Sequence, residues 1–160
     1  MSTMSPLESR LEADLTTALR AGEADRKRTL RSLKAALQYA AIEAAGKGGF
    51  VAGDHLDQTG VEAVLRKQAK QRRDSIEQFE RGGRDDLVAV ERAELAIIEA
   101  YLPQPLAAEE VEAAVRAQIA AVGANGPSDL GKVMGPLSKA LGGRVDGKFL
   151  SDTVRRLLAG

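Results

Sequence analysis

The segment Gly126–Lys132 has the spacing of a phosphate-binding loop. It matches the pattern G-x-x-x-x-G-K, in which backbone N–H groups and the lysine hold the phosphates of a nucleotide. Val133 stands where the magnesium-binding Ser or Thr is required, and the residues before the segment have the pattern of an amphipathic helix instead of a buried strand. The sequence therefore favours a loop and a helix cap over nucleotide hydrolysis.

The single histidine, His55, lies in the glycine-rich segment 46–57 beside Asp54 and Asp57, a combination that could bind a metal ion. One imidazole and two flanking carboxylates on an irregular segment do not form a rigid site, so a solvated loop is the favoured interpretation. With one histidine, no G-x-S-x-G motif and no cysteine, the familiar nucleophilic triads are excluded. We expect no catalytic residue, no metal and no cofactor.

Acid–base chemistry would need paired carboxylates, and Glu91, Glu94 and Glu99 are close in the sequence. Their spacing on a helix suits solvation and structural pairing better. Glu94 interrupts the apolar face of one predicted helix, as Arg72 interrupts the apolar face of the helix before it. Two alternatives stay open: Arg72 pairs with Glu94 in the interior, or its methylenes cover the core while the guanidinium reaches water.

Basic residues cluster in three parts of the chain, although the formal net charge is +0. Six lie in 20–34, seven in 66–84 against three acidic residues, and six in 128–160 against three acidic residues, whereas 85–112 hold eight carboxylates and one arginine. This alternation of sign favours pairing of one helix with the next, and phosphate contacts are the weaker alternative. No group of aromatic residues accompanies the clusters, so stacking of single-stranded bases is not expected.

Helical periodicity runs through the whole chain, and no stretch alternates apolar and polar residues over the length of a strand. Capping and breaking residues predict seven helices, at about 6–21, 25–45, 59–81, 85–102, 109–122, 130–141 and 147–158. Thr59-Gly60-Val61-Glu62 reads as the capping box of the third helix. Gly135-Pro136 should kink or split the sixth. The predicted fold class is all-α.

Pro103-Gln104-Pro105 is the best candidate for a boundary, because two prolines within three residues fix an extended connection. It separates an N-terminal four-helix subdomain, 1–102, from a three-helix tail subdomain, 103–160. The 160 residues, 44% of them hydrophobic, suffice for one domain or two small ones. Residues 1–10 contain no apolar stretch of signal-peptide length, and no run is long enough to span a membrane. We therefore expect a cytoplasmic location.

Several short motifs, in order and across nearly the whole chain, resemble the GatB/YqeY domain family and in particular its small stand-alone YqeY-like proteins. The motifs are Lys70–Phe79, Gly83–Leu87, Ala93–Leu95, Tyr101–Pro103, Gly131–Met134 and Gly143–Lys148. The resemblance implies an all-helical protein of two subdomains, the second similar to the tail of the B subunit of the glutamine-dependent tRNA amidotransferase. In that enzyme the tail helps to engage tRNA, and its catalytic body has no counterpart in this sequence.

If the role of that tail carries over, the matching motifs point to Lys132, Arg144 and Lys148 as nucleic-acid-binding residues. Arg155 joins them because it shares a helix face with Lys148. We expect a non-catalytic accessory protein that binds tRNA or a tRNA-handling enzyme through basic helical faces. The alternatives are an amidotransferase-like subunit, with carbon–nitrogen ligase activity and glutamine as amide donor, that needs a catalytic partner, or a protein–protein adaptor with no RNA role. The sequence leaves the oligomeric state open.

Overall fold

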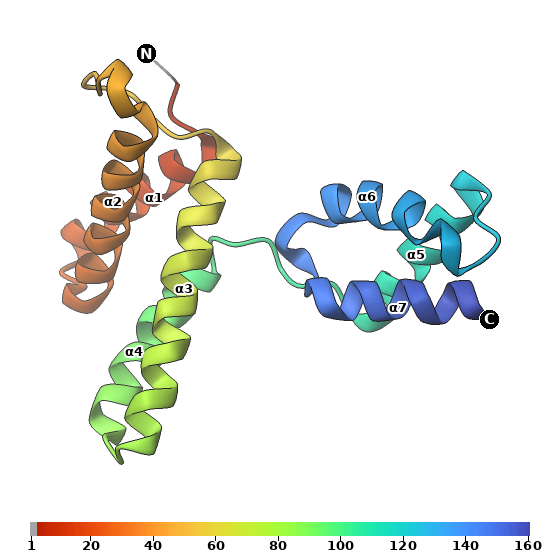
Figure 1. Cartoon of the computed structure of the whole chain (residues 1–160). Coiled ribbons are helices and arrows are strands. Elements are labelled where there is room, and N and C mark those ends of the chain that lie inside the picture. Colours follow the sequence, from red (N-terminus) through yellow and green to blue (C-terminus); the bar gives the residue numbers. More distant parts are fainter. Residues whose placement is uncertain (1–2) are drawn as a thin grey trace. The chain divides into compact units, whose positions relative to one another are not determined.

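The computed structural model describes residues 3–160 and contains, within them, seven α-helices and no β-strand (Figure 1). This confirms the prediction of an all-α fold. The helices are α1 (Pro6–Ala21), α2 (Ala24–Ala45), α3 (Gln58–Arg81), α4 (Asp85–Glu99), α5 (Ala108–Val122), α6 (Leu130–Leu141) and α7 (Gly147–Ala159). By contacts within the chain they form two compact units, Met1–Leu102 and Pro103–Gly160, called here the N-terminal unit and the tail unit.

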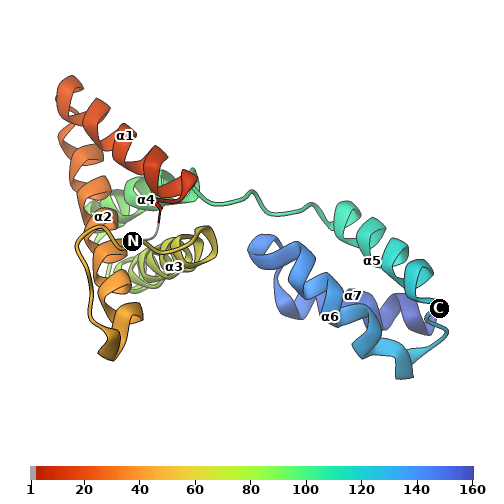
Figure 2. The ribbon, with the colours of Figure 1, turned by 90° about the horizontal axis from the view of Figure 1, so that it is seen from above.

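The N-terminal unit is built around a hairpin of α3 and α4, which lie side by side (Figures 1 and 2). The connection from Gly82 to Arg84 is short, so the two helices run antiparallel, and Gly83 provides the positive φ of 68° that the turn requires. Helices α1 and α2 form a second pair, and both contact α3. Leucines of α1 and α2 meet Val61, Leu65 and Ala69 of α3 in a core that excludes water.

The beginnings and ends of these helices depend on side chains that the periodicity alone does not identify. The carboxylate of Asp57, not the hydroxyl of Thr59, caps α3, because it accepts a hydrogen bond from the backbone N–H of Gly60 at 2.7 Å. The predicted capping box at Thr59 was therefore wrong. Helix α4 ends at Glu99, three residues before its predicted end, and Tyr101 and Leu102 follow in tight turns.

The tail unit packs α5, α6 and α7 around a small core of its own. Buried members of this core include Val115 of α5, Val133 of α6 and Val154 of α7. Pro136 does not split α6, which runs without interruption from Leu130 to Leu141. The prediction of a split was wrong, because a proline removes one N–H donor while the packing of α6 against both neighbours remains.

The segment between α2 and α3 is tied to the rest of the N-terminal unit. The Nδ1 atom of His55 lies 3.1 Å from Oε1 of Glu8, a buried carboxylate in the first turn of α1. The backbone N–H of Leu7 also donates to the side-chain oxygen of Gln58, at 3.3 Å. His55 is half-buried, so the expectation of a solvated loop was wrong for this residue. Among residues 3–160, no helix is both long and apolar enough to cross a bilayer.

Candidate nucleic-acid interface

The loop before α6 resembles a phosphate-binding loop in sequence. Its polar groups contact Asp129, a carboxylate of the same loop. Asp129 accepts a hydrogen bond from the backbone N–H of Asn125 at 2.9 Å, and its other oxygen lies 3.3 Å from Nζ of Lys132. The N–H of Asn125 and then the Lys132 ammonium lower the pKa of Asp129. The backbone donor and the lysine that a nucleotide phosphate would need therefore hold Asp129 instead.

Arg144 holds the start of the tail unit in place. Its Nε donates to the carbonyl oxygen of Gln104 at 3.1 Å, and its own carbonyl accepts from the N–H of Leu106 at 2.9 Å. Both contacts fix the segment that enters α5 against the turn between α6 and α7. The side chain is exposed, and its remaining N–H groups point to no carboxylate among the residues described.

Lys148 and Arg155 share an exposed strip of α7, seven residues and thus two turns apart. Between them Asp152 lies 4.0 Å from Arg155, at the limit of an ion pair, and both side chains are exposed. Lys148 makes no ion pair within residues 3–160. The buried side of the helix, which includes Leu150, Val154 and Leu158, faces the core. The structure thus brings Lys148 and Arg155 together on one surface of α7.

The other carboxylates of the tail unit do little to neutralise this strip. Asp146 caps α7 by accepting from the N–H of Phe149 at 3.0 Å. Glu112 of α5 pairs with Arg156, a residue that the sequence argument did not single out, and lies 3.9 Å from Arg116. Glu112 therefore compensates cations other than Lys148 and Arg155. The sequence does not reveal the role of Arg156, because its partner Glu112 lies on another helix, 44 residues earlier in the chain.

Basic residues of the N-terminal unit are, in contrast, engaged with acidic partners along α3. Ion pairs join Arg66 to Glu62, Lys70 to Asp74, Arg73 to Glu99, Arg81 to Glu77 and Arg92 to Glu80. Two of these pairs, those of Arg73 and Arg92, join α3 to α4. Within the cluster at 66–84, Arg73 thus joins α3 to α4, as the alternation of charge predicts, whereas Arg66, Lys70 and Arg81 pair within α3.

Arg72 and Glu94 meet at the centre of the α3–α4 hairpin. Nε of Arg72 donates to Glu94 at 3.1 Å, and another guanidinium nitrogen donates to Gln68 at 2.8 Å. The two charged side chains are only 14% and 18% exposed, respectively. Glu91, one turn before Glu94, has a buried oxygen without a hydrogen-bond partner among the residues described. Burial, followed by the charge of Glu94, raises the pKa of Glu91.

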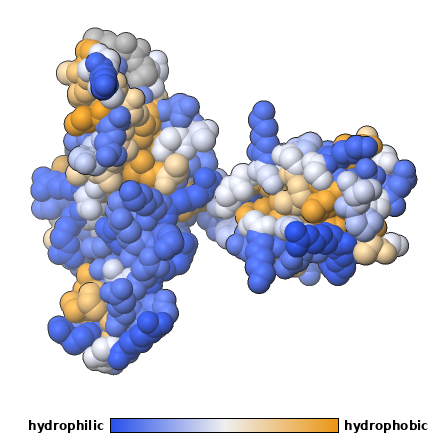
Figure 3. Space-filling view, in the orientation of Figure 1, coloured by the Kyte–Doolittle hydropathy of each residue, from blue (hydrophilic) through white to orange (hydrophobic). Residues whose placement is uncertain are grey.

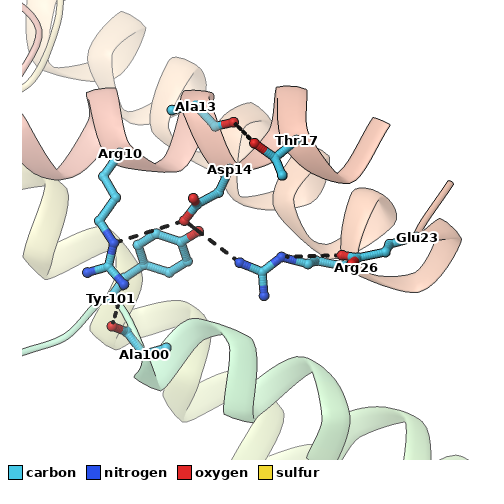
Figure 4. A network of polar contacts seen from close by, with 8 residues as sticks. All are labelled: Arg10, Ala13, Asp14, Thr17, Glu23, Arg26, Ala100 and Tyr101. Atoms are coloured by element: carbon cyan, nitrogen blue, oxygen red, sulfur yellow. Dashed lines mark hydrogen bonds and ion pairs between the residues drawn. The ribbon is translucent and has the colours of Figure 1, made fainter. Parts of the chain in front are cut away.

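A second polar network joins the end of α4 to α1 and α2 (Figure 4). The hydroxyl of the buried Tyr101 donates to Asp14 of α1, and Arg26 of α2 lies 3.7 Å from the same carboxylate. Arg10 stacks over the Tyr101 ring at 4.7 Å and donates to the carbonyl oxygen of Ala100 at 3.3 Å. Burial, and then the bond to Asp14, raise the pKa of Tyr101. The network anchors the last residues of the N-terminal unit just before the connection to the tail unit.

Neither network offers a set of metal ligands. Within residues 3–160 no group of three or more His, Cys, Asp and Glu side chains is arranged to hold a metal ion. The carboxylates of the hairpin are paired with basic residues or isolated, and His55 is held at Glu8. What the structure presents is a set of exposed cations on a small helical unit, Lys132, Arg144, Lys148 and Arg155.

The architecture is that of an all-helical protein with a four-helix N-terminal unit and a three-helix tail unit. The family model described as Yqey-like protein matches residues 8–158, so the chain belongs to the YqeY-like family. This confirms the resemblance found in the sequence motifs.

Several similar proteins are called altered inheritance of mitochondria protein 41, mitochondrial. That of Lachancea thermotolerans is 38% identical over 71% of this chain and 59% of its own length. The relative from Eremothecium gossypii is 36% identical over 67% of this chain and 55% of its own length, and that from Pyrenophora tritici-repentis is 28% identical over 93% and 79%. The chain thus spans little more than half the length of the first two relatives.

The names of these relatives contradict the prediction of a cytoplasmic location. That prediction relied on the lack of an apolar stretch such as a secretory signal peptide contains. Mitochondrial leaders are amphipathic and arginine-rich instead, so hydropathy does not test for them. The absence of an apolar stretch was therefore no argument for the cytoplasm.

Proposed function

We propose that this protein is a non-catalytic accessory factor whose tail unit binds tRNA. The observation that carries the proposal is the exposed strip of Lys148 and Arg155 on α7. Lys132 and Arg144 are also exposed, although they already contact Asp129 and the carbonyl oxygen of Gln104. From residue 128 onward the chain has six basic and three acidic residues. Asp129 pairs with Lys132, so five basic residues stand against Asp146 and Asp152, which leaves an excess of positive charge for phosphates.

The motif resemblance to the GatB/YqeY domain family implies a tail similar to that of the tRNA amidotransferase B subunit, and this expectation favours RNA over another polyanion. Arginine and lysine on a helix surface bind phosphates without reading the bases, so we expect recognition of tRNA shape more than of sequence. Few aromatic side chains are present to stack on bases. The proposal therefore concerns backbone contacts to a folded RNA.

Titration of total tRNA at several salt concentrations tests the proposal. Phosphate contacts release counterions, so the affinity should fall steeply as salt rises. In the variant Lys148→Glu/Arg155→Glu, the dissociation constant should rise at least about tenfold and the salt dependence should become shallower, because about two contacts are lost. The matched control is Lys70→Glu/Arg73→Glu on α3, which should bind like the wild type. Absence of binding at low salt, or equal weakening by both variants, would refute a tRNA site on the tail unit.

An assay of a purified complex separates this function from the amidotransferase alternative. If the chain is a subunit of such an enzyme, glutamine-dependent amide transfer should require its presence together with the catalytic partner. An accessory factor that only binds RNA should leave the partner's rate unchanged at saturating tRNA. The amidotransferase alternative is supported by the motif resemblance alone, because no catalytic residue has been identified in this chain.

A further inference from the structure

Phe149 of α7 is the one large apolar side chain that the tail unit exposes. Of the seven such side chains exposed among residues 3–160, the other six belong to the N-terminal unit. Phe149 is 40% exposed and is also the only aromatic residue in 103–160. The core of the tail unit consists of aliphatic side chains and does not include it. A single exposed apolar side chain is common on protein surfaces, so its surroundings decide what it can bind.

The backbone of Phe149 is fixed on both sides. Its N–H donates to the carboxylate of Asp146 at 3.0 Å, which caps α7, and its carbonyl oxygen accepts from the hydroxyl of Thr153 at 2.8 Å. Thr153 is itself buried. Since the ring is attached to a fixed backbone by two rotatable bonds, little conformational freedom remains to be lost on binding. Phe149 is thus a preorganised contact.

Two cations without an ion pair lie close to Phe149 in sequence. Lys148 directly precedes it, and Arg144 lies in the turn that leads into α7; both side chains are exposed. The ion pairs of the tail unit involve Arg116, Lys132, Arg155 and Arg156 instead. The acidic residue between the two cations, Asp146, accepts the N–H of Phe149. Positive charge is therefore available beside the ring.

Phe149 shares the solvent-exposed side of α7 with Lys148 and Arg155. It lies about 100° around the helix from Lys148, and the buried Leu150 and Val154 occupy the opposite side. Figure 3 shows hydrophobic and strongly hydrophilic residues side by side on the visible surface of the tail unit. A ligand that covers the exposed side of α7 therefore meets an aromatic ring and cations together.

We propose that the ring of Phe149 stacks on one unpaired base of the bound RNA, while Lys148 and Arg144 contact the adjacent phosphates. The inference rests on the proposed function and refines it, because it assigns recognition to an unpaired nucleotide in a loop or a single-stranded end. Paired bases are covered on both faces by their neighbours in the duplex, so only an unpaired base offers a face to the ring. A long single strand needs several aromatic residues in a row, which the chain lacks, whereas one ring is enough for one base.

The size and the charge of this surface favour a nucleotide over a partner protein. A protein interface has a hydrophobic core made of many side chains, and the exposed apolar surface of α7 is one ring. An unpaired nucleotide combines one flat aromatic base with one phosphate charge. It therefore matches a single ring that has cations beside it.

Titration of total tRNA with the full chain tests the proposal. Phe149→Leu removes the aromatic face and keeps an apolar side chain, so the dissociation constant should rise at least about fivefold. Its dependence on salt should stay that of the wild type, because no charge is lost. Phe149→Trp should bind within about twofold of the wild type, because the indole restores a stacking face. The matched control is Phe50→Leu, at an equally exposed phenylalanine (41%) of the N-terminal unit, which should have no effect.

Fluorescence measures the stacking directly. The chain has no tryptophan, so Phe149→Trp provides a single emission signal. Total tRNA and a short single-stranded oligoadenylate should quench this emission, and a blunt-ended RNA duplex of the same length should not. A tRNA without its unpaired 3′ end distinguishes the two sources of the base. Quenching that persists assigns the base to a loop, and quenching that disappears assigns it to the 3′ end; both results support stacking.

Three results would overturn the stacking and leave the tRNA proposal intact. They are wild-type affinity for tRNA in Phe149→Leu, unquenched emission of Phe149→Trp in a tRNA complex, and equal quenching by the duplex. If circular dichroism shows that Phe149→Leu is misfolded, the fluorescence of Phe149→Trp decides alone. Absence of tRNA binding by the wild-type chain at low salt refutes the tRNA site itself and the stacking with it.

Discussion

At the scale of single residues, Arg72 and Glu94 place two opposite charges in the interior of the α3–α4 hairpin, where each is the ion-pair partner of the other. Both side chains are mostly buried, and Gln68 satisfies a further N–H group of the arginine. A buried pair of this kind costs desolvation that its attraction roughly offsets, so its main consequence is the penalty when one partner is removed. It thereby fixes the register of the two helices more than it adds net stability.

We expect Arg72→Leu to lower the free energy of unfolding by roughly 3 kcal/mol, because Glu94 is left without its partner beside the poorly solvated Glu91. The double variant Arg72→Leu/Glu94→Leu should recover most of this loss. Urea denaturation followed by circular dichroism measures both values. Arg73→Leu is the control, because its pair with Glu99 is exposed and should contribute less than about 1 kcal/mol. Equal losses for Arg72 and Arg73 would contradict the assigned role.

Glu91 should give the hairpin a pH dependence of stability. Its pKa is raised in the folded chain by burial and by Glu94, so folding favours the protonated form. The stability contributed by this group is present below its unfolded pKa and is lost as pH rises through its folded pKa. Glu91→Gln should therefore stabilise the protein at pH 7, by less than about 1 kcal/mol, and the gain should vanish near pH 4. Melting temperatures across this range, with the exposed Glu77→Gln as control, measure the effect; a gain independent of pH would refute it.

At the scale of elements, the N-terminus of α3 depends on Asp57. We expect Asp57→Ala to cost about 1 kcal/mol, because the N–H of Gly60 loses its acceptor. Thr59→Ala, one residue inside the helix, should change stability by less than about 0.5 kcal/mol. Comparison of the melting temperatures of the two variants shows whether Asp57 or Thr59 caps α3. A larger loss for Thr59→Ala would restore the capping box predicted from the sequence.

The helices themselves could be predicted from the sequence, because a period of 3.6 in the apolar residues reports which face is buried. The same periodicity placed Arg72 and Glu94 on facing stripes. Two kinds of detail could not be obtained in this way. A cap depends on which of several polar side chains adopts the right geometry, as Asp57 does instead of Thr59. Contacts such as Arg144 with Gln104, or His55 with Glu8, join residues distant in sequence that no local pattern connects.

At the scale of the whole molecule, charge is distributed differently in the two units. In the N-terminal unit most basic residues of α3 hold acidic partners. In the tail unit Lys148 of α7 has no ion-pair partner among the described residues, whereas Arg155 lies 4.0 Å from Asp152 and Arg156 pairs with Glu112 of α5. The formal net charge of +0 conceals this division. A local excess of positive charge on α7 is therefore compatible with the absence of a strong overall field.

Because each unit has its own core, we expect the two to fold independently when the chain is divided between Leu102 and Pro103. The 58-residue tail unit should be the less stable of the two, since small domains bury a smaller share of their surface. NMR spectra of fragments 1–102 and 103–160 should overlay with those of the full chain except near the cut. The tail fragment should bind tRNA like the full chain, and the variant Lys148→Glu/Arg155→Glu should weaken it equally. An unfolded tail fragment would show that its core depends on the N-terminal unit and would contradict the division into two folding units.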